Sequence, residues 1–130
     1  MLGLTASLLI CHFLADFTHL SRPWMLKAKA TGKPVFPIFC HAAVHTTLMA
    51  LVLITYKFIR GINDGGHEVL IFPALALQLV SHTLIDTLKG YLNLFEGFRN
   101  PASQWHWIIF GADQVCHQLI ILWMVYLCIS

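Results

Sequence analysis

The chain has 130 residues, of which 58% are hydrophobic and only 11% are charged. A soluble domain would carry about 25% charged residues, so the composition argues against a soluble globular protein and predicts an integral membrane protein. The formal net charge of +2 is too small to indicate a nucleic-acid partner.

Four long apolar stretches follow one another along the chain. Each reaches the roughly 20 residues that a helix needs to cross about 30 Å of hydrocarbon. We therefore predict a single domain over residues 1–130, an all-α integral membrane bundle of four up-and-down helices. The predicted helices cover residues 1–20, 35–59, 69–88 and 101–130.

Prolines and glycines mark the breaks between these stretches. Lys33-Pro34 precedes the second helix, GINDGG at 61–66 predicts a turn, and Asn100-Pro101 opens the fourth helix. In the third connection, aromatic and apolar residues recur at helical spacing, which predicts a short helix in the membrane interface. These residues are Tyr91, Leu94, Phe95 and Phe98.

The charges on the connections predict the orientation in the membrane. The first connection carries four basic residues and no acid, the third has two basic residues against one acid, and the second is balanced. The positive-inside rule then places the first and third loops in the cytoplasm. We expect a multi-pass protein of the inner membrane, with both termini outside.

Each predicted helix carries one polar pair at a spacing of four residues, which places both side chains on one helical face. A carboxylate or an imidazole at bilayer depth costs a few kcal/mol or more, so such residues usually serve a function. The pairs are His12 with Asp16, His41 with His45, His82 with Asp86, and Asp113 with His117.

The depth of the pairs predicts that they meet. Those of the first and third helices lie toward the C-terminal ends, and those of the second and fourth lie in the N-terminal halves. In an up-and-down bundle the eight side chains therefore converge at one level near the cytoplasmic leaflet. His12 and Asp16 recur 70 positions on as His82 and Asp86, which suggests two parallel hairpins related by an axis along the membrane normal.

Imidazole nitrogens and carboxylate oxygens together are ligands for zinc, iron, manganese or cobalt. Eight donors exceed what one tetrahedral ion uses, so we predict two divalent ions roughly 3.5–4 Å apart, with zinc favoured and iron or manganese as alternatives. The pairs contain no cysteine, which argues against a closed structural zinc site. Two other interpretations stay open: hydrogen bonds that hold the helices together, and a proton relay.

Three other polar residues lie near the pairs in sequence. Lys89 lies one turn after Asp86, where it could hold a substrate anion or stabilise developing negative charge, or extend to the interface. His19 lies seven residues after His12, and either joins the site or sits in the wetted interface. His106 lies between two tryptophans and is expected to anchor the interface.

The four motifs, in this order, resemble those of a known family. They are HFLADF at 12–17, HAAVH at 41–45, HTLIDTLK at 82–89 and DQVCH at 113–117. The family is domain of unknown function 3307, a group of small bacterial and phage integral membrane proteins, and the resemblance spans nearly the whole chain. A glutamine commonly follows the aspartate of the first motif by one turn, whereas this chain has Leu20. The resemblance supports the choice of motif residues and implies no activity.

The predicted function is a membrane-embedded metal-dependent hydrolase acting on a lipid-linked or amphiphilic substrate. Paired ions lower the pKa of a bound water toward about 7, with Asp86 as a proton acceptor and Lys89 facing an anionic headgroup. One alternative is a di-iron lipid oxidase or hydroxylase, although such sites use glutamates, which the predicted helices lack. Another is a metal or proton translocator, which would need a homo-oligomer, or a metal-stabilised module of a larger assembly.

Overall fold

The computed structural model describes residues 1–64 and 70–129. Within them the chain forms six helices and no strand, which confirms the predicted all-helical class. The helices are α1 (Leu2–Phe17), α2 (Pro23–Thr31), α3 (Val35–Asp64), α4 (Ile71–Leu92), α5 (Glu96–Arg99) and α6 (Gln104–Ile129).

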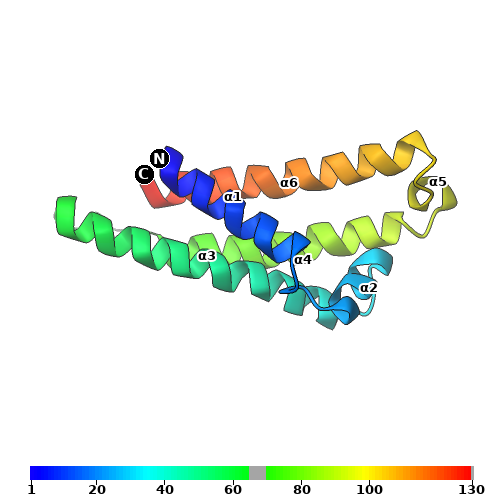
Figure 1. Ribbon diagram of the computed structural model, residues 1–130, viewed down its shortest axis with the longest axis horizontal. Coiled ribbons are helices and arrows are strands. Elements are labelled where there is room, and N and C mark those ends of the chain that lie inside the picture. The colour runs from blue at the N-terminus through cyan, green and yellow to red at the C-terminus, as the bar shows by residue number, and fades with distance from the viewer. Residues whose placement is uncertain (65–69, 130) are drawn as a thin grey trace.

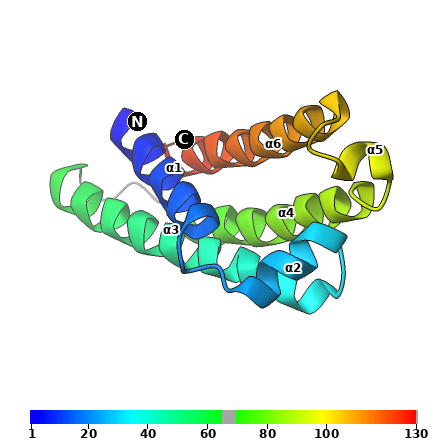
Figure 2. The ribbon, with the colours of Figure 1, turned by 45° about the vertical axis from the view of Figure 1, so that its right-hand side comes forward.

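The four long helices form a ring in which each contacts two others. α1 packs on α3, α3 on α4, α4 on α6, and α6 on α1. The short helices α2 and α5 lie at one end of this ring, and both termini lie at the other end (Figure 1, Figure 2). The first and third connections therefore share one end, as an up-and-down bundle requires.

Three of the helices are long and apolar enough to cross a membrane. The candidate spans are Val35–Arg60, Ile71–Leu92 and Gln104–Ile129. The outer surface of these helices carries large apolar side chains, such as Phe72, which is 87% exposed. Such surfaces suit contact with lipid rather than with water. α1 has only 16 residues, so its crossing of the membrane does not follow from length.

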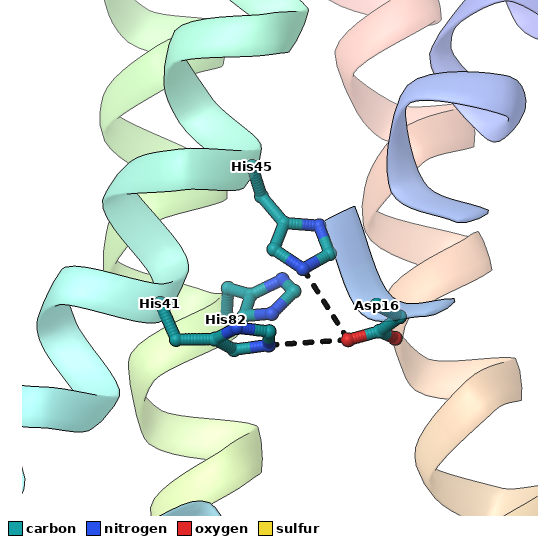
Figure 3. Close-up of side chains that lie close together, drawn as sticks. All are labelled: Asp16, His41, His45 and His82. Atoms are coloured by element: carbon teal, nitrogen blue, oxygen red, sulfur yellow. Dashed lines mark hydrogen bonds and ion pairs between the residues drawn. The ribbon is translucent and has the colours of Figure 1, made fainter. Parts of the chain in front are cut away.

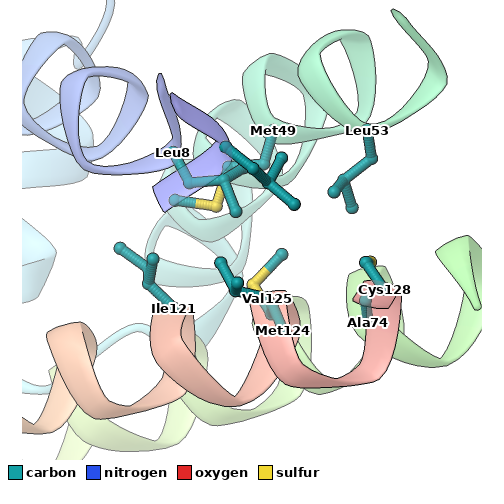
Figure 4. Packing of buried hydrophobic residues seen from close by; sticks show 9 residues of the cluster. Leu8, Met49, Leu53, Ala74, Ile121, Met124, Val125 and Cys128 are labelled. Carbon is teal, nitrogen blue, oxygen red and sulfur yellow. The ribbon is translucent and has the colours of Figure 1, made fainter. Parts of the chain in front are cut away.

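An apolar core fills the half of the bundle nearest the termini. It brings together side chains from α1, α3, α4 and α6, which point toward one another in Figure 4. Its buried members are Leu4, Leu8, Met49, Leu53, Ala74, Ile121, Met124, Val125 and Cys128. The buried polar side chains come from the other half, so the interior changes from apolar to polar along the bundle axis.

α2 corrects the expectation of a plain basic loop between the first two long helices. It begins with Pro23 in its first turn and ends at Gly32, whose φ of 72° is left-handed. Proline at the first helical position and glycine just after the last are the usual boundaries of a helix. α2 buries Met25 and Ala28 and packs on α3 and α4.

Two glycines allow the end of α2 to lie directly on the backbone of α4. A Cβ atom added to Gly90 would lie 2.0 Å from the backbone nitrogen of Gly32, and one added to Gly32 would lie 2.8 Å from the carbonyl oxygen of Thr87. Neither distance is sterically possible for a larger residue. The contact therefore fixes the C-terminal end of α2 against α4.

Other helix boundaries also differ from prediction, and α6 begins at Gln104 rather than at the predicted Pro101. α1 ends at Phe17 because Thr18 is fully extended (φ −122°, ψ −179°). α3 continues through Asp64, so the turn predicted at 61–66 is wrong over its first four residues, and its last two lie outside the described residues. α4 extends to Leu92, and the helix predicted in the third connection is the four-residue α5.

Candidate metal centre

All eight predicted ligands lie together in the polar half of the bundle. None of their side chains is more than 6% exposed. They come from α1, α3, α4 and α6 in pairs, because the four-residue spacing turns both members of each pair to the same inward face. In Figure 3, Asp16 and three of the histidines converge from three different helices.

The five imidazole rings form one contiguous group. The ring centroids of His45 and His82 are 4.0 Å apart, and those of His82 and His117 are 4.1 Å apart. His12 lies 4.8 Å from His45, and His41 lies 4.7 Å from the same ring. Imidazole nitrogens from all four long helices therefore lie close together in one small volume.

The carboxylates lie among these rings. Asp16 Oδ1 is 3.1 Å from Nε2 of His41 and 3.4 Å from Nε2 of His45 (Figure 3). Asp86 Oδ1 is 3.3 Å from Nε2 of His117. These separations place oxygen and nitrogen donors side by side, as a shared cation requires.

Two sets of donors, among the described residues, lie close enough to hold a metal ion. Within each set the donor atoms lie within 4.8 Å of one another. The sets are Asp16, His41, His45 and His82, and His82, Asp86 and His117. His82 belongs to both sets. His12 and Asp113 fall outside them but border them, since the His12 ring lies tilted against that of His45 and Asp113 lies 3.4 Å from His117 Nε2.

Several of these buried donor atoms have no hydrogen-bond partner. They include both ring nitrogens of His12 and of His45, Nε2 of His82, and Oδ2 of Asp86. A buried polar atom without a partner costs about 1–3 kcal/mol, so native proteins rarely leave one unpaired. Neutral imidazole and carboxylate lone pairs are the donors that a divalent transition metal takes. The residues present therefore fit a metal ion.

Lys29 is a site residue that the sequence analysis did not find. Its Nζ atom lies 3.0 Å from Asp16 Oδ1, 3.3 Å from Asp86 Oδ1 and 3.2 Å from His41 Nε2. Burial by itself lowers the pKa of the ammonium, but the carboxylates of Asp86 and Asp16 outweigh burial and hold the pKa above its ordinary value. Lys29 is therefore a cation within the cluster.

Ser21 and Gln78 orient two of the histidines. The Ser21 hydroxyl donates to the carbonyl of Ala15 at 2.5 Å, so its oxygen accepts the Nδ1 proton of His41 at 2.8 Å. That tautomer turns the lone pair of His41 Nε2 toward the carboxylates. The Gln78 side-chain amide lies 3.1 Å from Nδ1 of His82 and holds the second ring. Hydrogen bonds of this kind fix the rings of metal-binding histidines.

The remaining polar residues of the motifs lie at the edge of the cluster or outside it. Lys89 donates to Asp113 Oδ2 at 2.6 Å and lies 4.9 Å from the ring centroid of Phe110. His106 Nδ1 donates to the carbonyl of Phe98 at 2.8 Å, which ties α6 to α5. His19 is exposed. A role for Lys89 toward a substrate stays a prediction.

The sequence of the chain matches a known protein family. The sequence profile of the family described as "Protein of unknown function (DUF3307)" matches residues 4–130. No curated protein and no solved structure matches the chain. The match covers all eight predicted ligands together with Lys29 and Lys89, and it agrees with the resemblance of the four motifs. The chain therefore belongs to the DUF3307 family.

Proposed function

We propose that the protein is a membrane-embedded, metal-dependent hydrolase that acts on an amphiphilic substrate. The observation that carries this proposal is the buried cluster of His and Asp side chains, in which several donor atoms, among them both ring nitrogens of His12 and His45, have no hydrogen-bond partner. Hydrogen bonds that merely hold helices together, worth about 0.6 kcal/mol each in a membrane, would not explain donors that make none.

The surrounding residues suit hydrolysis. A divalent ion held here would supply a Lewis acid and lower the pKa of a bound water. Asp86 and Asp16 lie beside the donors and can accept the proton that the attacking water loses. The ammonium of Lys29, within 3.3 Å of both carboxylates, can stabilise the negative charge that develops on a phosphoryl or carbonyl oxygen.

A groove between α4 and α6 supports an amphiphilic substrate. It has a volume of about 120 Å³ and an almost wholly apolar lining, and Lys89 and Asp113 are among the residues that line it. Leu88 and Cys116 line it and are exposed on the outer surface of the bundle. An acyl chain in this groove would place an anionic headgroup at Lys89. A larger groove of about 500 Å³ between α1 and α3 has none of the site residues in its lining.

The apolar core argues for an enzyme rather than a translocator. Leu8, Met49, Leu53, Ile121 and Met124 are completely buried between the cluster and the terminal end of the bundle. An ion or a proton crossing this layer would lose its hydration with no polar group to replace it. We extend the proposal to an inner-membrane protein whose four long helices all cross, with α2 and α5 on the cytoplasmic side.

Metal analysis tests the proposal directly. Protein purified in detergent and loaded with zinc is expected to retain the ion through buffer exchange. The double variant His82→Ala with His117→Ala is expected to lose most of it, because two of the three donors of one set are removed and His82 also belongs to the other set. Elemental analysis by mass spectrometry measures the ion per chain. A folded wild-type protein that binds no zinc, iron or manganese would end the proposal.

Alkylation of the native cysteines tests the groove. In nanodiscs, dodecyl phosphate is expected to slow the reaction of Cys116 with a maleimide several-fold, because the chain would cover this groove-lining thiol. Cys40 on α3 does not line the groove and provides an internal control. The Lys89→Met variant is expected to lose the protection. Equal protection of Cys116 and Cys40 by dodecyl phosphate would contradict binding in this groove. Protection of Cys116 by uncharged dodecyl maltoside would contradict a headgroup site at Lys89.

A further inference from the structure

The ammonium of Lys29 occupies the position that a second cation would take in a dinuclear site. It lies between two carboxylates from different helices, 3.0 Å from Asp16 Oδ1 and 3.3 Å from Asp86 Oδ1. A carboxylate that faces two cations is the usual arrangement where two divalent ions act together. Here a covalently attached cation already bridges Asp16 and Asp86.

The position of Lys29 is built into the fold. α2 is held by its buried face and by the backbone contact between Gly32 and Gly90. Lys29 lies three residues before Gly32, so the fixed end of the helix also fixes the starting point of its side chain. The side chain is 13% exposed, which is unusual for a lysine that serves only to keep a loop soluble.

The charges of the cluster balance with one divalent ion rather than two. Asp16, Asp86 and Asp113 contribute three negative charges, while Lys29 and Lys89 contribute two positive charges. One divalent ion leaves the buried cluster with a single positive charge, which one bound hydroxide or one substrate monoanion neutralises. Two divalent ions would leave three positive charges in a region of low dielectric constant, which is costly.

We infer that Lys29 replaces the second metal ion, so that the centre binds one divalent ion per chain beside the ammonium. This inference rests on the proposed function, and it replaces the two ions that the sequence predicts. His82, which belongs to both donor sets, and the unpaired Oδ2 of Asp86 would hold the single ion. The substrate class that fits the remaining charge is a singly charged anion, such as a phosphodiester or a carboxylate, held between the ion and Lys29.

The metal count of Lys29 variants tests the inference. Wild-type protein saturated with zinc and freed of excess ion is expected to hold one ion per chain. Lys29→Ala removes the cation and frees Asp16, so the count is expected to rise toward two. Lys29→Arg keeps the charge and is expected to hold one. Lys27→Ala, on the exposed face of α2, is the matched control and is expected to behave as the wild type.

The outcomes separate the inference from the proposed function. Two ions in the wild-type protein would overturn the role of Lys29 and leave the proposed function standing, whereas none would overturn both. One ion in wild type and in Lys29→Ala alike, with unchanged zinc affinity, would also overturn the role of Lys29. If Lys29→Ala does not fold, the electron paramagnetic resonance spectrum of manganese-loaded wild type decides: isolated ions support the inference, and a coupled pair contradicts it.

Discussion

Asp86→Ala is expected to abolish metal binding and to destabilise the protein by about 3–5 kcal/mol, the usual cost of leaving buried partners without their counter-charge. Asp86 is fully buried, and its carboxylate lies 3.3 Å from both Lys29 Nζ and His117 Nε2. Removing it leaves the ammonium without one of its two carboxylates and removes the oxygen donor from the set that also contains His82 and His117. Elemental analysis and thermal unfolding in detergent measure the two effects.

Glu96→Ala is the control for removing an acidic side chain that lies outside the cluster. Glu96 is exposed in α5, so its removal is expected to change neither the metal content nor the unfolding temperature. Asp86→Asn keeps the size of the side chain and separates charge from packing, because the amide is nearly isosteric with the carboxylate. Retention of the ion by Asp86→Ala at the wild-type level would show that Asp86 is not part of the centre.

Gly90→Ala is expected to displace α2 and with it Lys29. The added Cβ would lie 2.0 Å from the nitrogen of Gly32, 2.4 Å from its Cα and 2.7 Å from the carbonyl oxygen of Lys29. All three are backbone atoms, so no side-chain rotation relieves the overlap, and we expect a cost of at least about 1–3 kcal/mol.

Limited trypsin digestion measures the release of α2. Trypsin does not cut before proline, so Arg22 and Lys33 in the first connection are resistant, and Lys27 and Lys29 are the sites that a released α2 would expose. We expect cleavage after these two lysines to be at least several-fold faster in Gly90→Ala than in the wild type, because proteolysis follows local unfolding.

Gly111→Ala is the matched control for a glycine in a long helix. Apart from its chain neighbours and the backbone of its own helix, no described atom lies within 4 Å of a Cβ at this position in α6. Alanine in a helix interior is about 0.5–1 kcal/mol more favourable than glycine. This variant is therefore expected to be as stable as the wild type or more stable, with unchanged digestion. If Gly90→Ala behaved in the same way, the close contact between α2 and α4 would not exist in solution.

The sequence predicts the long helices and the convergence of the polar pairs because both depend on local periodicity. A spacing of four residues determines which face of a helix a side chain occupies, and the apolar composition of the rest of each helix determines that this face turns inward. His41, His45, His82 and Asp86 are completely buried, as the pattern predicts. The helix ends were less predictable, since they depend on local turns such as the one at Thr18.

Lys29 was missed because its place depends on packing between distant parts of the chain. As one of four basic residues in a connection, it matched the positive-inside pattern, which explains such charges without any site. The boundaries of α2 could have been predicted from the sequence, since Pro23 and Gly32 stand where a helix begins and ends. The contact of Gly32 with Gly90, 58 positions further on, brings Lys29 to the acids, and no local pattern encodes that contact.

In the proposed arrangement, in which all four long helices cross the membrane, the shortness of α1 has a consequence for the surrounding bilayer. At about 1.5 Å per residue, its 16 residues extend roughly 24 Å, less than the roughly 30 Å of a typical hydrocarbon layer. A helix shorter than the layer is accommodated by local thinning of the bilayer or by polar residues that reach outward from its ends. Lipids next to α1 would then carry their headgroups several ångströms deeper than elsewhere. For the hydrolase that we propose, a scissile bond near a headgroup would thus approach Asp16 without the lipid being pulled out of its leaflet.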